Sequence, residues 1–70
     1  MEFQYVDSSS VEQFAYDADN QELHIIFIKG GYYIYSQVSP ETAEEFATAP
    51  SKGQFVHYVL KKQGFPCRKA

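Results

Sequence analysis

The chain changes its hydrophobic period once, near Val38, and this change constrains the fold more than any other feature. Before Val38, apolar residues mostly alternate with polar ones, as in strands that bury one face. After it, apolar residues recur three and four positions apart, as on one side of a helix. Because strands and helices are segregated along the chain, we expect an α+β domain. A chain of 70 residues has room for one core, so residues 1–70 are predicted to form a single domain.

Three strands are predicted before the change of period, and they cover residues 11–16, 22–29 and 32–38. Asp17–Gln21 concentrates turn-forming residues between the first two strands, and Gly30-Gly31 predicts a hairpin between the second and third. The expected sheet is therefore a three-stranded antiparallel meander. Residues 1–6 are a candidate for a short edge strand.

Two short helices are predicted after the change of period. Ser39 suits the N-cap of the first, Pro40 suits its first helical position, and Ala49-Pro50 ends it. The second begins after an N-cap at Ser51 and ends at Gly64. The predicted order is β-β-β-α-α, with both helices packed on one face of the sheet.

Charge is distributed unequally along the chain. Residues 1–45 hold nine carboxylates and one lysine, a balance of -8, whereas the remainder holds five cations and no acid. The net charge of -3 argues against non-specific wrapping of nucleic acid, but a basic helical end can still supply a local patch that faces phosphates. The alternative is that the two ends only attract each other and aid solubility.

The basic end carries the first candidate binding surface. Its cations and one histidine follow the second predicted helix from its start to beyond its end: Lys52, His57, Lys61, Lys62 and Arg68. A polar, cationic helix face is what phosphate binding requires. The same pattern also describes the solvated face of an ordinary amphipathic helix.

Tyr33 and Tyr35 form the second candidate, and they share one face of the third predicted strand. With a two-residue Gly30-Gly31 turn, both rings lie on the face away from the main core. With a three-residue turn that begins at Lys29, Tyr33 pairs with Phe27 and both rings face the core. Exposed rings can stack on bases, whereas buried rings are structural, and the sequence leaves both alternatives open.

Residues that support catalysis are sparse. Neither His24 nor His57 has metal-ligand spacing, and the chain has no phosphate loop or nucleophile elbow. Cys67 lies beside two cations, which favour a thiolate, but it is an isolated thiol near the chain end. Turn chemistry accounts for Asp17 and Asp19-Asn20. We therefore expect a non-enzyme with no metal site and no cofactor.

The compartment follows from the cysteine count and the apolar runs. A single cysteine cannot form an internal disulfide, so a reducing cytoplasm is the expected location. The longest unbroken apolar run is Ile25–Ile28, far below the ~20 residues that a membrane-spanning helix needs. No association with a membrane is expected.

Five short motifs, in this order, resemble the KTSC domain: Phe14-Ala15-Tyr16-Asp17, Leu23-x-Ile25-x-Phe27, Gly31-Tyr32-Tyr33-Ile34-Tyr35, Val38-Ser39-Pro40 and Ala49-Pro50-Ser51-Lys52-Gly53. This domain occurs at the C-terminus of some lysyl-tRNA synthetases and as a small bacterial protein of its own. The resemblance runs from about Ser8 to Phe65. It implies no established function, although the association with a tRNA enzyme suggests RNA binding through the two tyrosines and Ser51–Gly53.

Two functions follow as hypotheses. The first is a non-enzymatic module that binds RNA weakly, with phosphates held by cations and bases stacked on aromatic rings; its candidate residues are Tyr33, Tyr35, Lys52, His57, Lys61, Lys62 and Arg68. The alternative is a protein-interaction module or homodimer that uses a second apolar sheet face. That face would be made of Tyr16, Ile26 and Ile28 together with the two tyrosines.

Overall fold

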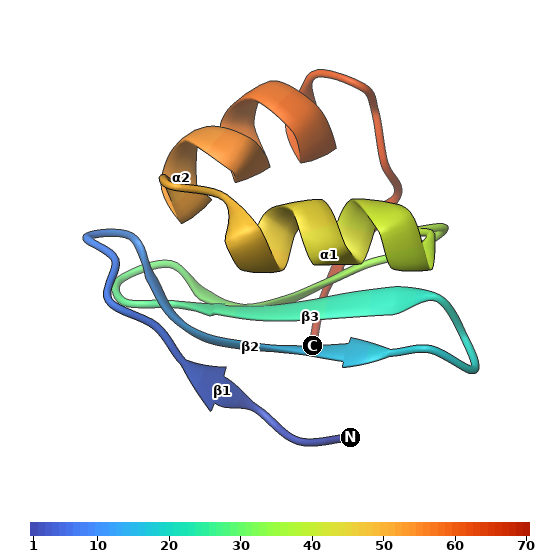
Figure 1. Ribbon diagram of the computed structural model, residues 1–70, viewed down its shortest axis with the longest axis horizontal. Coiled ribbons are helices and arrows are strands. Elements are labelled where there is room, and N and C mark those ends of the chain that lie inside the picture. The colour runs from blue at the N-terminus through green and yellow to red at the C-terminus, as the bar shows by residue number, and fades with distance from the viewer.

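Five antiparallel strands form one sheet in sequence order, and the helices cover one of its faces (Figure 1). The computed structural model describes residues 1–70. The strands are β1 Gln4–Tyr5, β2 Val11–Asp17, β3 Glu22–Phe27, β4 Gly31–Tyr35 and β5 Cys67–Lys69. The helices are α1 Pro40–Thr48 and α2 Lys52–Phe55, and α2 continues into a π-helical segment, Val56–Lys61. The α+β class and the placement of both helices on one face are confirmed, but the three-stranded meander is only part of the sheet.

The strand missing from the sequence prediction is β5, which pairs with β4 at one edge of the sheet. Its three residues, Cys67–Lys69, are all exposed and include two cations, so they show no alternation of apolar and polar residues. Backbone bonds from Ser36 N to Pro66 O (2.8 Å) and from Ala70 N to Tyr32 O (2.9 Å) extend the pairing. At the other edge, the candidate strand in residues 1–6 is confirmed as β1.

The turn between β3 and β4 places both central tyrosines on the helix-covered face, here called the inner face. Phe27 pairs with Gly31, so the loop is residues 28–30, and Gly31 has a φ of +92°. Tyr33 consequently pairs with Ile25, and Tyr35 pairs with Leu23. Neither of the two predicted registers is right. The face is nevertheless the one that the three-residue turn predicts, because the actual register differs from it by two residues.

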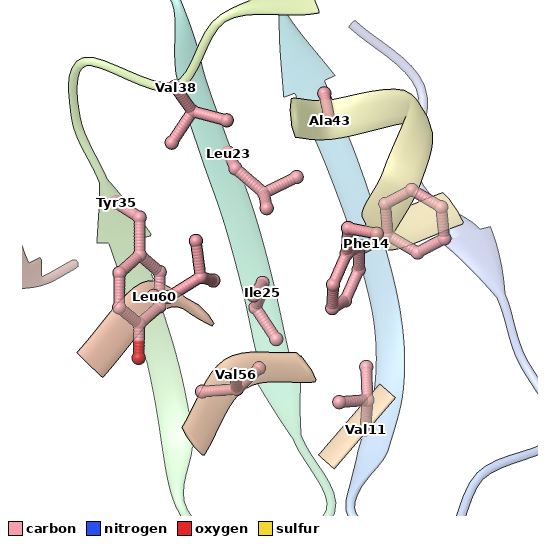
Figure 2. Packing of buried hydrophobic residues seen from close by; sticks show 10 residues of the cluster. Val11, Phe14, Leu23, Ile25, Tyr35, Val38, Ala43, Val56 and Leu60 are labelled. Atoms are coloured by element: carbon pink, nitrogen blue, oxygen red, sulfur yellow. The ribbon is translucent and has the colours of Figure 1, made fainter. Parts of the chain in front are cut away.

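The core lies between the inner face and the helical layer (Figure 2). A register shift between Val11 and Gln13 inserts one extra residue into β2, which allows Val11 and Phe14 to point to the same side. Phe46 of α1 is fully buried and meets the Phe14 ring edge-on, with 5.0 Å between ring centroids. The Phe55 ring also meets Phe46 edge-on, with 5.5 Å between ring centroids.

The predicted helix starts are confirmed by their caps. The Ser39 hydroxyl accepts a bond from Thr42 N at 3.2 Å, and the Ser51 hydroxyl accepts one from Gln54 N at 3.3 Å. The start of α2 also packs very closely on the start of β2. A Cβ added to Gly53 would lie 2.5 Å from the Ser10 hydroxyl oxygen, so a larger residue there would displace the Ser10 side chain.

The chain reverses at Gly64, where the second helix was predicted to end. Gly64 has a φ of +77°, its N–H bonds to Lys61 O at 3.1 Å, and Phe65 N bonds to Leu60 O at 3.0 Å. This pair of bonds is a Schellman motif, and it directs the chain back to the sheet, where β5 begins. None of the helices combines the length and apolar character needed to cross a membrane.

Candidate functional site

A groove opens at one corner of the inner face, between the β3–β4 loop, β5 and the π-helical segment. Its volume is about 700 Å³. Half of its lining is apolar and the rest is hydroxyl, amine and thiol: Ser9, Ser10, Phe27, Ile28, Lys29, Gly30, Tyr33, Tyr35, Val56, Lys61 and Cys67. A second hollow of about 530 Å³ shares several of these residues and extends toward α2 along Gly53, Gln54, His57 and Tyr58. We call the two together the corner groove.

The tyrosines differ in their relation to the corner groove. Tyr35 is only 3% exposed and belongs to the core cluster. Burial raises the pKa of its hydroxyl, and the neighbouring Cys67 thiol raises it further. Tyr33 is half-buried and meets the Phe27 ring edge-on at 6.0 Å. The prediction that both rings offer a stacking surface is therefore wrong for Tyr35, because its ring faces are covered. Tyr33 remains available at the wall of the groove.

Lys61 and His57, two of the candidate phosphate-binding residues, lie together on the π-helical segment. Both are exposed, and both line the corner groove. The His57 ring meets the Tyr58 ring edge-on at 4.8 Å, and Tyr58 is 58% exposed. This helical surface thus offers a cation beside two accessible rings.

The other three predicted cations lie elsewhere. Lys52 Nζ donates to Ala49 O at 2.8 Å, so this side chain stabilises the C-terminal end of α1. Lys62 Nζ lies 6.0 Å from the centre of the Tyr58 ring, outside the lining of the groove. Arg68 lies on the uncovered side of the sheet, here called the outer face, where its Nη1 is 3.1 Å from Glu22 Oε2. The predicted cationic surface is therefore divided among three places.

Two other lysines, which were not among the candidate residues, lie at or beside the groove. Lys29 lines the groove from the β3–β4 loop. Lys69 pairs with Tyr33 across β4 and β5, and its side chain reaches Gly31 beside the groove. For Lys69, the only available sequence signal was the basic end of the chain. The position of that end depends on the pairing of β5 with β4.

The second apolar sheet face is also corrected. Tyr16 pairs with Leu23 on the inner face, as Tyr35 does, and Tyr33 lies on that face too. On the opposite side, Ile26 is half-buried, and Ile28 lies in the loop at 46% exposure. The proposed residues therefore do not form one continuous apolar surface.

The outer face instead carries a small cluster around a buried histidine. His24 is 8% exposed, and its Nδ1 lies 2.8 Å from the Tyr32 hydroxyl. The Phe3 ring covers both residues edge-on, at 6.3 Å from His24 and 5.7 Å from Tyr32. The second ring nitrogen of His24, Nε2, is buried without a hydrogen-bond partner.

Fold and groove together define a small α+β domain with helices on one face of an antiparallel sheet. The chain belongs to the KTSC domain family, whose model matches residues 7–65. It is similar to a KTSC domain protein of Yersinia pestis of known crystal structure, with a TM-score of 0.91, 39% identity, and coverage of 99% of this chain and 96% of that one. The resemblance stated from the motifs is thus confirmed.

Two further relatives show where such sequences occur. A protein of Tsukamurella paurometabola is 38% identical over 58 residues, and the match covers 83% of this chain and 87% of that protein. A lysine–tRNA ligase of Trichormus variabilis is 34% identical over 55 residues, and the match covers 79% of this chain but 10% of the ligase. The chain therefore corresponds to a small part of the ligase.

Proposed function

We propose that this chain is a non-enzymatic module that binds single-stranded RNA weakly in the corner groove. The observation that carries the proposal is the arrangement of three lysines, Lys29, Lys61 and Lys69, around a groove walled by Tyr33. A backbone phosphate suits the ammonium groups, and a base suits the aromatic wall.

Size and chemistry of the groove support a nucleotide-sized occupant. A volume of about 700 Å³ lies within the range of ligand pockets, roughly 300–1,000 Å³. The hydroxyls of Ser9 and Ser10 add hydrogen-bonding groups at one side. On the adjoining helix, His57 and Tyr58 are exposed and offer ring faces for a second base. The relative named lysine–tRNA ligase acts on tRNA, which gives this choice of nucleic acid further support.

A titration of labelled single-stranded RNA at low salt tests the proposal. We expect binding that weakens as salt rises, with a logarithmic slope of about 0.7 for each phosphate contacted. Lys61→Ala should weaken binding and lower the salt slope. Arg68→Ala is the matched control, because it removes one cation from the outer face, away from the groove.

Three outcomes would contradict the proposal. No binding at millimolar protein removes RNA as the ligand. Equal losses in Lys61→Ala and Arg68→Ala indicate attraction by overall charge rather than by the groove. A salt-independent interaction indicates that the RNA is not held through its phosphates.

A further inference from the structure

The outer face brings three metal-ligating side chains together at the β2–β3 turn. We propose that Asp17, Glu22 and His24 form a binding site for a divalent transition-metal ion, with Zn²⁺ as the best fit. One potential ligand atom from each residue lies within 4.8 Å of the others. This site is on the face opposite the corner groove and does not depend on RNA binding.

The sheet register fixes the positions of all three side chains. Asp17 is the last residue of β2 and pairs with Glu22, the first residue of β3. Paired residues of an antiparallel ladder point to the same face, and so do residues two apart on one strand. Glu22 and His24 therefore extend from one strand beside Asp17, in a geometry set by the backbone and not by a flexible loop.

The buried imidazole of His24 is the observation that points to a ligand. Its Nε2 is shielded from solvent and has no hydrogen-bond partner, and Glu22 Oε1 lies 3.8 Å away. A buried polar atom without a partner is costly, by about 1–3 kcal/mol. A metal ion bound to Nε2 would satisfy it.

The other ring nitrogen is held as in known metal sites. Histidine ligands commonly donate their second N–H to a polar group, which fixes the tautomer and the ring orientation. Tyr32 supplies that group, because its hydroxyl lies 2.8 Å from His24 Nδ1. When Nδ1–H donates to this oxygen, the Nε2 lone pair points toward the carboxylates. Phe3 packs against both rings and restricts their movement.

The donor set selects the class of metal. One imidazole nitrogen and two carboxylates are typical ligands for Zn²⁺ and related first-row ions, whereas Ca²⁺ and Mg²⁺ prefer oxygen alone. Three protein ligands leave one position for water in a tetrahedral site. Residues 1–45 also carry a balance of -8, nine carboxylates against one lysine, which attracts cations to this part of the molecule.

Arg68 competes with the metal for Glu22. Its guanidinium Nη1 lies 3.1 Å from Glu22 Oε2 and 3.2 Å from the Ser36 hydroxyl. Zn²⁺ binds such ligands at about 2.0–2.2 Å. The ligand atoms, which lie within 4.8 Å of one another, must therefore move closer together when the ion binds. Binding therefore needs Glu22 to turn from Arg68 toward His24, and removal of Arg68 should strengthen it.

Calorimetric titration with Zn²⁺ alone tests the site. The full chain carries Cys67→Ser and His57→Ala, because these exposed side chains could bind Zn²⁺ independently. We expect one ion per chain. Asp17→Asn and Glu22→Gln should each weaken binding by at least about tenfold, judged from the 10- to 100-fold losses seen even when outer-shell groups are removed.

Further variants separate coordination from general attraction of charge. Asp19→Asn is the matched control, because Asp19 is an exposed acid in the same turn but outside the ligand set. It should leave affinity nearly unchanged. Tyr32→Phe should weaken binding by about tenfold, because His24 Nδ1 loses the hydroxyl that orients its ring. Arg68→Ala should tighten binding. In NMR spectra, Zn²⁺ should shift the His24 Nε2 resonance, which gives a readout in the folded parent chain.

The proposal is overturned if the parent chain shows no saturable Zn²⁺ binding. It is also overturned if Asp19→Asn weakens binding as much as Glu22→Gln, or if His24 Nε2 does not shift while Zn²⁺ binds. Unfolding of a variant does not affect the last measurement, because that measurement uses the parent chain.

Discussion

The two faces of the sheet bury their side chains in different ways. The inner face is covered by α1, α2 and the π-helical segment, and its contacts join residues far apart in sequence, such as Phe14 and Phe46. The outer face has no helix. Its cover at His24 and Tyr32 is the ring of Phe3, the residue that precedes β1.

The difference also appears in how buried polar groups are satisfied. On the inner side, the Tyr16 hydroxyl donates to Val38 O at 2.6 Å. On the outer side, His24 Nε2 has no hydrogen-bond partner. The acceptor on the inner side comes from the connection between β4 and α1, whereas the Phe3 ring that covers His24 has no acceptor group. The outer face is therefore where an external ligand gains most.

The largest expected effect compares the rings that cover each face. Phe46→Ala should destabilise the fold by about 3–5 kcal/mol, because it leaves a large cavity in the core. Phe3→Ala should cost about 1 kcal/mol, because Phe3 is only half-buried. Urea denaturation measures both values. Equal losses would show that the outer cover is as important to stability as the core.

The next prediction tests the tightness of the inner layer. Gly53→Ala should destabilise the fold by about 1–3 kcal/mol, because the new methyl group meets the Ser10 side chain. Ser10→Gly removes the atoms that clash, so the double variant should lose less stability than the sum of the two single variants. Thermal denaturation of all three variants forms the test. Simple additivity would contradict the close approach.

Removal of one hydroxyl from each face gives a smaller difference. Tyr16→Phe leaves the carbonyl of Val38 without this donor and should cost about 1–2 kcal/mol. Tyr32→Phe leaves the buried His24 Nδ1 without a partner and should cost a similar amount, about 1–2 kcal/mol. A much smaller loss for Tyr32→Phe in chemical denaturation would show that water replaces the missing hydroxyl on the outer face.

The smallest effects concern pH, and the two faces act at opposite ends of the scale. Burial raises the pKa of Tyr35 on the inner face above its ordinary 10.0. Above pH 10 the unfolded chain releases this proton first, so stability should fall as pH rises. Tyr35→Phe should flatten the alkaline part of the stability profile. An unchanged slope would contradict the role of burial.

On the outer face, the Asn20 side-chain bond lowers the pKa of Asp17 below its ordinary 3.8, and His24 contributes to the shift. The carboxylate therefore stabilises the fold above that pH, and this contribution is lost as pH falls through the lowered value. Asp17→Asn should weaken the pH dependence of the free energy of unfolding between about pH 5 and 2, the range around the ordinary and lowered pKa of Asp17. An acid profile identical to the parent would exclude Asp17 as its source.

Local signals in the sequence were sufficient for much of the fold. Alternation predicts β2, β3 and β4, and the caps Ser39 and Ser51 predict both helix starts, because each depends on neighbouring residues only. β5 was not predicted, because it pairs with a strand more than 30 residues away in the sequence. Tyr33 of β4, for example, pairs with Lys69 of β5. The register between β3 and β4 was also not predicted, since it depends on which residues the turn leaves unpaired.

The candidate site was less predictable than the fold for the same reason. Lys61 and His57 could be grouped from the sequence because they lie on one helix, and both line the corner groove. Lys52 lies away from the groove, because its side chain bonds to Ala49 O across the short turn between α1 and α2. In the motif Ser51–Gly53, all three residues have structural roles: a cap, a bond to the preceding helix and a close approach to Ser10. A sequence motif therefore does not by itself identify a binding surface.

The position of β5 has a kinetic consequence for the groove. Loop closure between distant segments is slow, so the edge that joins β4 to β5 should form after the hairpin and the core. Cys67 and Lys69 lie at or beside the groove and arrive only with that edge. Short, exposed edges also open most readily in the native state. We expect amide hydrogens of β5 to exchange faster than those of β3, because the β4–β5 edge opens while the core stays folded. Each opening would remove one wall of the groove for a short time.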